Sequence, residues 1–197
     1  MYNPSQFIDK LKSTDSVYNH RYRGTMISSY SYDNSFLEYL VISSPVTENS
    51  HNSSLLTDIL NEKVFTVNSR KRNGLIIFKK HHAEFAGPGA VVGGDYDRDC
   101  QGVLPIGHLS LLGIDASNHE ERQKAYLIRR QWIRLIKQIT ENPSPSQRIQ
   151  KILDQFEQYF PSDVVAGLPD EAFALLIGVL PQTVCIARHL GRDIDGK

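Results

Sequence analysis

The hydrophobic period of the sequence changes once, close to Asn118, and this change constrains the fold more than any other feature. Upstream, from about Tyr22 to Ile114, short stretches rich in Tyr, Ser, Val and Ile are broken by Pro and Gly, which is typical of strands and turns. Downstream, apolar residues recur at spacings of three and four, which predicts helices. We therefore expect an α+β protein in which the strands come first and the helices last.

The first half contains five candidate strands, separated by turn signals such as Asn73-Gly74 and Gly87-Pro88-Gly89. They are Phe36–Ile42, Val64–Val67, Leu75–Phe78, Ala90–Val92 and Leu109–Ile114. The second and third of them, joined by Asn68–Gly74, favour a β-hairpin. The polar run Thr47–Ser54 predicts a loop, and a helix is expected after it at Leu55–Leu60.

The second half begins with a helix of about five turns that starts after Asn118, a residue suited to N-capping. It ends at Asn142-Pro143, because proline cannot continue the helical hydrogen bonds. Ser146 is the expected cap of a second helix, which Pro161 ends. Two short helices follow on either side of a turn, at Asp170–Ile177 and Pro181–Leu190.

Composition excludes several classes of protein. The 197 residues are 40% hydrophobic and 22% charged, close to globular averages, which excludes disordered, collagen-like and disulfide-rich chains. Lys+Arg 22 balances Asp+Glu 22, so binding to nucleic acid must come from a local patch. Cys100 and Cys185 have no metal-ligand or redox spacing, and neither a signal-like N-terminus nor an apolar run of about 18 residues is present. We expect a cytoplasmic protein without a membrane partner.

The tail of the sequence has the spacing of a helix-turn-helix, with Pro169 before its first helix and Pro181 in the first turn of its second. The spacing alone leaves open a helical hairpin that only fills a core. Through Glu171–Val179 and Gln182-Thr183-Val184, the tail resembles the Crp/Fnr family of bacterial transcription regulators. Residues 148–153 resemble the helix that leads into the DNA-binding domain of that family.

Further back, residues 85–94 are similar to the glycine-proline-glycine turn of the family's β-roll sensor domain. The resemblance implies a β-roll, which is a cupin-like jelly roll, over residues 1–117, a long dimerisation helix over 118–141 and a helix-turn-helix over 142–197. The implied function is that of a DNA-binding transcription regulator acting as a homodimer. The expected dimer interface on the long helix consists of Ile128, Trp132, Leu135, Ile136 and Ile139.

The recognition helix departs from the family pattern. The family usually places an arginine, an acidic or polar residue and a second arginine where this chain has Pro181, Gln182 and Ile186. Bidentate reading of guanine is therefore lost, although glutamine can still pair with adenine. The remaining candidate contacts, to bases for the first and to phosphates for the others, are Gln182, Thr183, Arg188 and Arg192. The motif that holds a cyclic nucleotide is also missing after Gly93, so we expect no cyclic nucleotide and no other cofactor.

Two polar clusters invite a metal-site interpretation. His81-His82 with Glu84 has the residue types of a cupin metal site, but adjacent strand residues point to opposite faces, which favours a solvated strand end. Asp95, Asp97 and Asp99 alternate like calcium ligands, yet the glycine and glutamate of a calcium loop are missing, which favours a polar turn. We expect no metal site.

Six basic residues crowd the first long helix: Arg122, Lys124, Arg129, Arg130, Arg134 and Lys137. Most lie opposite its apolar stripe, which favours a solvated face over a surface that contacts phosphates or a partner. No nucleophile with its base, P-loop or dinucleotide fingerprint is present, so an enzyme, including a cupin-type metalloenzyme, is the least supported class. The alternative to the regulator is a non-enzymatic adaptor that keeps the fold, has lost specific DNA binding and contacts another regulatory protein.

Overall fold

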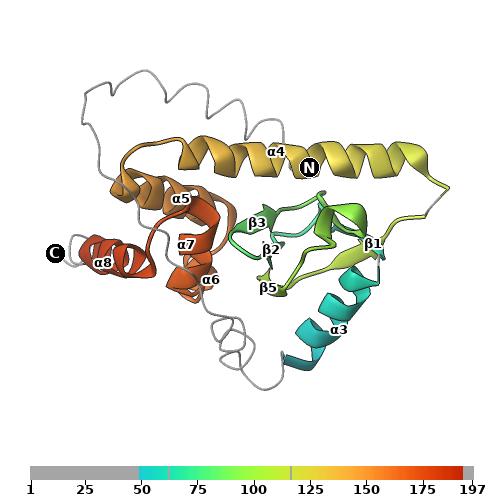
Figure 1. The fold of residues 1–197 in the computed structure, drawn as a ribbon, viewed down its shortest axis with the longest axis horizontal. Coiled ribbons are helices and arrows are strands. Elements are labelled where there is room, and N and C mark those ends of the chain that lie inside the picture. Colours follow the sequence, from blue (N-terminus) through green and yellow to red (C-terminus); the bar gives the residue numbers. More distant parts are fainter. Residues whose placement is uncertain (1–48, 62, 116, 193–197) are drawn as a thin grey trace.

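The structure, a computed structural model, describes residues 49–61, 63–115 and 117–192, without the side chains of 49–53 and 189–192. Two small sheets lie at its centre, helix α4 (His119–Thr140) runs along one side of them, and the later helices gather at one end (Figure 1). The mixed α+β class is therefore confirmed. The predicted strand Phe36–Ile42 lies outside the described residues.

Six strands of the described residues form two three-stranded antiparallel sheets. The first has the order β4-β1-β6, built from β1 (Val64–Val67), β4 (Val91–Gly93) and β6 (Leu111–Gly113). The second has the order β3-β2-β5, built from β2 (Gly74–Phe78), β3 (Ala83–Ala86) and β5 (Gly102–Ile106). A 3₁₀ helix, η1 (Gly94–Asp97), follows β4 directly.

The predicted hairpin between β1 and β2 is wrong, because these strands belong to different sheets. Phe65 on β1 faces Val92 of β4, whereas Ile76 on β2 faces Phe85 of β3. The connection between the two strands is tied to the β5–β6 loop instead. The Asn68 N–H donates to the Ser110 carbonyl at 2.9 Å, and the Ser110 N–H donates to the Asn73 side chain at 3.3 Å. These hydrogen bonds hold the connection in place where the chain passes from the first sheet to the second.

Strand β2 is the central strand of its sheet, and helix α3 (Asn49–Leu60) lies outside the sheets (Figure 1). All five residues of β2 are buried, because sheet neighbours pair with both of its edges and packing covers both of its faces. The helix predicted from Leu55 starts earlier, at Asn49, inside the stretch expected to be a loop. Ile59, 1% exposed, anchors α3 to the core, while most of its other described side chains are exposed or half-buried.

The long predicted helix is confirmed as α4. Its N-cap is Asn118, whose side chain accepts a hydrogen bond from the Glu121 N–H at 3.1 Å. On its inner face, Trp132 packs edge-on against Phe85 of β3, with ring centroids 5.1 Å apart. A Cβ on Gly87 would lie 2.4 Å from the Trp132 ring, so the glycine turn after β3 gives the indole its place.

The remaining helices are α5 (Pro145–Tyr159), α6 (Ser162–Ala166), α7 (Asp170–Ile177) and α8 (Pro181–Arg192). Ser144, rather than the predicted Ser146, caps α5, because Pro145 already occupies its first turn. Helix α6 was not predicted. A cluster of aromatic rings connects these helices to the sheets, as Phe85 of β3 lies 5.1 Å from Phe156 of α5, which lies 5.5 Å from Phe173 of α7.

One hydrophobic cluster therefore runs from α3 through the sheets to Val184 on α8. Sheets and helices stabilise one another through it. Within the described ranges, no single helix has the length and apolar character to cross a membrane, and only the bent pair α7 and α8, counted together, meets that test.

Candidate functional site

Helices α7 and α8 form a tight bihelical unit. The chain bends by 118° between them, within the range of about 90–120° that helix-turn-helix motifs show. Gly178 closes α7 in the left-handed conformation, with φ 65°, and the Val179 N–H donates to the Ala174 carbonyl at 3.1 Å. Glycine suits this position because it adopts positive φ without strain. Ile177 and Val184, both fully buried, pack in the core beside this turn.

The predicted DNA-contacting residues differ in their accessibility. Gln182 is exposed in the first turn of α8, and Thr183 beside it is half-buried. Arg188 is half-buried, while Arg192 ends the helix and its side chain lies outside the described part of the structure. Among the three candidates whose side chains are described, Gln182 is thus the most accessible.

Arg188 is held by the protein itself. Its guanidinium donates to the Asp170 carboxylate at 2.6 Å and to the carbonyls of Leu168 at 2.8 Å and Ala166 at 2.7 Å. The side chain is 11% exposed and lies over the ring of Phe173. Arg188 therefore binds backbone carbonyl groups at the end of α6 and just before α7. Both terminal nitrogens of its guanidinium have acceptors within the chain.

The exposed face of α8 and of the turn before it carries apolar side chains. Leu180 is 51% exposed and Ile186 is 60% exposed. Gln182 lies between them in the sequence and is also exposed. The exposed side chains described on this surface are therefore polar or apolar, and none of them is basic. Few positive charges among the described side chains of this surface are therefore available to contact a phosphate.

The stripe expected to form a dimer interface is covered within the chain. Trp132, Leu135, Ile136 and Ile139 are each 7% exposed or less, and they lie in the core cluster. Ile128 is half-buried beside the turn at Gly89. The reason for expecting a second copy on this stripe, its apolar exposure, therefore does not apply.

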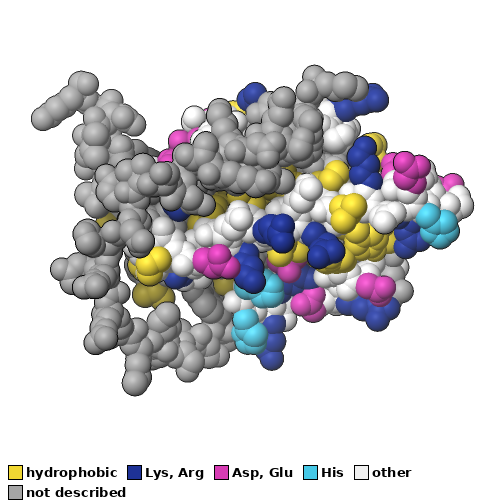
Figure 2. Space-filling model, turned by 90° about the horizontal axis from the view of Figure 1, so that it is seen from above, with side chains coloured by type: hydrophobic (Ala, Val, Ile, Leu, Met, Phe, Trp, Pro, Cys, Tyr) yellow, Lys and Arg dark blue, Asp and Glu magenta, His cyan; other side chains and the backbone are white. Residues whose placement is uncertain are grey.

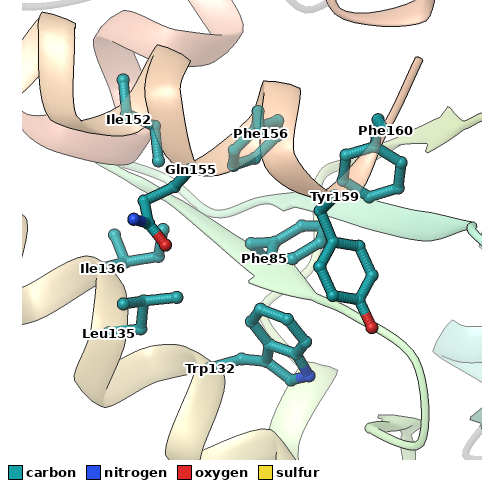
Figure 3. Close-up of a pocket in the computed structure, with 9 residues that line it drawn as sticks. All are labelled: Phe85, Trp132, Leu135, Ile136, Ile152, Gln155, Phe156, Tyr159 and Phe160. Carbon is teal, nitrogen blue, oxygen red and sulfur yellow. The ribbon is translucent and has the colours of Figure 1, made fainter. Parts of the chain in front are cut away.

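Figure 3 shows what covers it: Phe85 of β3 and aromatic residues of α5 close over the α4 stripe. The narrow apolar pocket between these elements is lined by Phe85, Trp132, Leu135, Ile136, Ile152, Gln155, Phe156, Tyr159 and Phe160. The Gln155 amide points from α5 toward Ile136, and its oxygen has no hydrogen-bond partner among the described residues.

The opposite face of α4 carries a row of basic side chains, visible in dark blue in Figure 2. Arg130, Arg134 and Lys137 are exposed, and no ion pair holds them within the described residues. Arg129 was grouped with them by the sequence, and that placement is wrong. Its side chain is 0% exposed, because it lies on the buried stripe four residues after Ala125 and three before Trp132.

Arg129 belongs to a buried ion network that joins α4 to both sheets. It contacts Glu84 on β3 at 2.6 Å and Asp97, at the end of η1, at 3.3 Å. Lys79, just after β2, contacts Asp97 at 3.3 Å and also forms an ion pair with Asp99. Lys79 and Asp97 are also nearly inaccessible, with side chains 3% and 0% exposed.

The ion pair between Lys79 and Asp99 is electrostatically favoured in its charged form. Burial alone would lower the pKa of Lys79, but its hydrogen bond to Asp99 and the attraction of Asp97 outweigh burial, and the pKa is raised. The hydrogen bond from Lys79 in turn lowers the pKa of Asp99. Nearby, burial raises the pKa of the Cys100 thiol to about 11.

Sequence reasoning missed this network, although two signals for it were present. Arg129 occupies a position of the apolar stripe of α4, which for an arginine implies a buried acidic partner. Asp97 is the middle member of the alternating aspartates Asp95, Asp97 and Asp99, whose spacing is like that of calcium ligands. Across the described residues, no three His, Cys, Asp or Glu side chains are grouped to hold a metal ion.

Comparisons with protein-family models, with curated proteins and with solved structures return no match.

Proposed function

We propose that this protein is a DNA-binding transcription regulator of the Crp/Fnr type that acts as a homodimer and does not depend on a cyclic nucleotide. In this proposal the two sheets are a reduced β-roll of the cupin-like jelly-roll kind, α4 is the central helix, and α7 and α8 are the helix-turn-helix. The observation that carries the proposal is the α7–α8 unit, with its 118° bend and its left-handed glycine turn.

The order of elements supports the same function. Two antiparallel sheets precede one long helix, and the bihelical unit follows it and packs on the same core. Gln182, exposed in the first turn of α8, is the side chain of this unit best placed to reach a base edge. Because the stripe of α4 is covered internally, the proposed homodimer uses another surface of the chain.

The surface of α8 determines what kind of DNA binding is proposed. Arg188, which the sequence assigned to a phosphate, is held by Asp170 and three carbonyl groups close by. Since phosphate contacts supply most of the affinity of such proteins, a helix with few free cations among its described side chains binds duplex DNA weakly. We therefore propose weak binding with little sequence preference.

A second candidate function is favoured by the same surface. Leu180 and Ile186, each more than half exposed, give α8 an apolar face that suits a protein partner better than a phosphate backbone. The second proposal is an adaptor that docks another regulatory protein on α8 and does not bind DNA.

The two functions differ in one measurement, the anisotropy of a fluorescent random-sequence duplex titrated with the full chain across a salt series. The regulator predicts saturable binding at low salt, with a logarithm of affinity that falls linearly with the logarithm of salt concentration. The adaptor predicts a free duplex even at the lowest salt.

A further inference from the structure

The Asp97 carboxylate is surrounded by hydrogen-bond donors and positive charge. Its Oδ2 accepts the Gly93 N–H at 2.8 Å, and its Oδ1 lies 3.3 Å from both the Lys79 ammonium and the Arg129 guanidinium. These groups come from the residue just after β2, from β4 and from α4. Two buried cations and a backbone N–H that converge on one carboxylate are the parts of an anion-binding site.

The backbone beside Asp97 has a conformation that depends on two glycines. Gly93 has φ 87° and Gly94 has φ 63°, so two successive residues adopt conformations that favour glycine. A Cβ on Gly93 would lie 2.0 Å from the Lys63 carbonyl oxygen, which excludes any other residue without a backbone shift. Glycine at this position therefore keeps the backbone geometry in which the Gly93 N–H donates to the Asp97 carboxylate.

The site also has more donors than acceptors. Arg129 carries five N–H groups, and those on Nη2 contact Asp97 and Glu84. Its Nε and Nη1 are buried and have no hydrogen-bond partner among the described residues. Of the other acids that face these cations, Glu84 is 21% exposed and shared with His82, and Asp99 is 67% exposed. Asp97 is the fully buried acid at the centre.

We propose that Asp97 is an internal ligand. Its carboxylate fills a small-anion site made by Lys79, Arg129 and the Gly93 N–H, and this contact fixes α4 on the sheets without an anionic effector. A chain that lacks the carboxylate has an open site, which a free carboxylate of the same size, such as formate, fills. The proposal does not rest on DNA binding and stands or falls independently of it.

The test is chemical rescue of Asp97→Ala in the full chain, followed by thermal unfolding in chloride-free buffer. Removing one partner from a buried ion network leaves uncompensated charge, so the melting temperature should fall by about 10 °C. Formate should restore most of this loss with a saturable dose response. The control is Asp95→Ala, two residues earlier on the same 3₁₀ helix, whose side chain is 83% exposed and pairs with Arg98. Its melting temperature and its response to formate should equal those of the unmodified chain.

A second readout follows α4 directly. Trp132, the single tryptophan of the sequence, lies three residues after Arg129 and packs on Phe85. Its emission should shift to the red in Asp97→Ala and return with formate. If formate changes Asp97→Ala no more than it changes the unmodified chain, the site does not take an anion and the proposal is overturned.

Should Asp97→Ala not fold, Asp97→Asn keeps the shape and removes the charge. It should melt several degrees lower and gain nothing from formate, because the amide occupies the site. An Asp97→Asn chain as stable as the unmodified one would equally overturn the proposal, since the negative charge would then not matter.

Discussion

At the scale of single residues, Arg188 has a structural role that can be separated from DNA binding. It joins α8 to Asp170 and to the carbonyls at the end of α6. Arg188→Ala leaves these acceptors unpaired and should lower the free energy of unfolding by about 2–4 kcal/mol, measured by urea denaturation followed by circular dichroism. Arg130→Ala, which removes an exposed arginine of α4, should change it by less than about 0.5 kcal/mol. Equal stability of the two variants would refute this role.

Cys100 gives the protein a dependence on alkaline pH. Burial raises its pKa from 9.0 to about 11, so between these values the folded chain keeps a proton that the unfolded chain has lost. The contribution of the protonated Cys100 to the free energy of unfolding is complete below pH 9. It is lost as the pH rises, by about 1 kcal/mol between pH 8 and pH 10. Cys100→Ala should lose this part of the pH dependence in urea denaturation. Cys185→Ala, which changes a half-buried thiol on α8, should retain it; a common slope in both variants would contradict the assignment.

At the scale of secondary-structure elements, α4 is a core helix with one covered face. Ile136→Asp puts a carboxylate among Phe85, Trp132 and the α5 side chains and should destabilise the chain by at least about 3 kcal/mol. The loss should not depend on protein concentration, because the residue packs within one chain. Leu127→Asp, on the exposed face of the same helix, should cost less than about 1 kcal/mol. The contrary result is a denaturation midpoint that rises with protein concentration in the unmodified chain but not in Ile136→Asp. It would place a second copy of the chain on the stripe.

Local signals predicted the helices better than the strand pairing. The Asn118 cap, the following apolar period and Asn142-Pro143 were enough to define α4, because helical hydrogen bonds are local. The pairing of β1 with β4 and β6 depends on contacts between residues far apart in the sequence. A turn signal before β2 therefore suggested a hairpin that the Asn68 and Asn73 contacts to Ser110 exclude.

At the scale of the whole molecule, the two halves predicted from the change of period share one core. The candidate site was only partly predictable for a related reason. Gln182 lies in the first turn of α8, as the spacing of the tail predicts, and its contact with DNA stays a prediction. Acidic partners of Arg129 and Arg188 lie 45 and 18 residues away, and no local spacing indicates such contacts.

The central claim is that the exposed face of α8 is the surface that meets DNA, and two arginine substitutions test it most directly. Ile186 on α8 and Leu127 on α4 are exposed by 60% and 51%, so Ile186→Arg and Leu127→Arg add the same charge at comparable cost to the fold. In the duplex titration, Ile186→Arg should tighten binding and steepen the salt dependence by about one unit, as one added phosphate contact requires. Leu127→Arg should leave both unchanged. An equal or larger gain from Leu127→Arg, or no gain from Ile186→Arg, would contradict the claim.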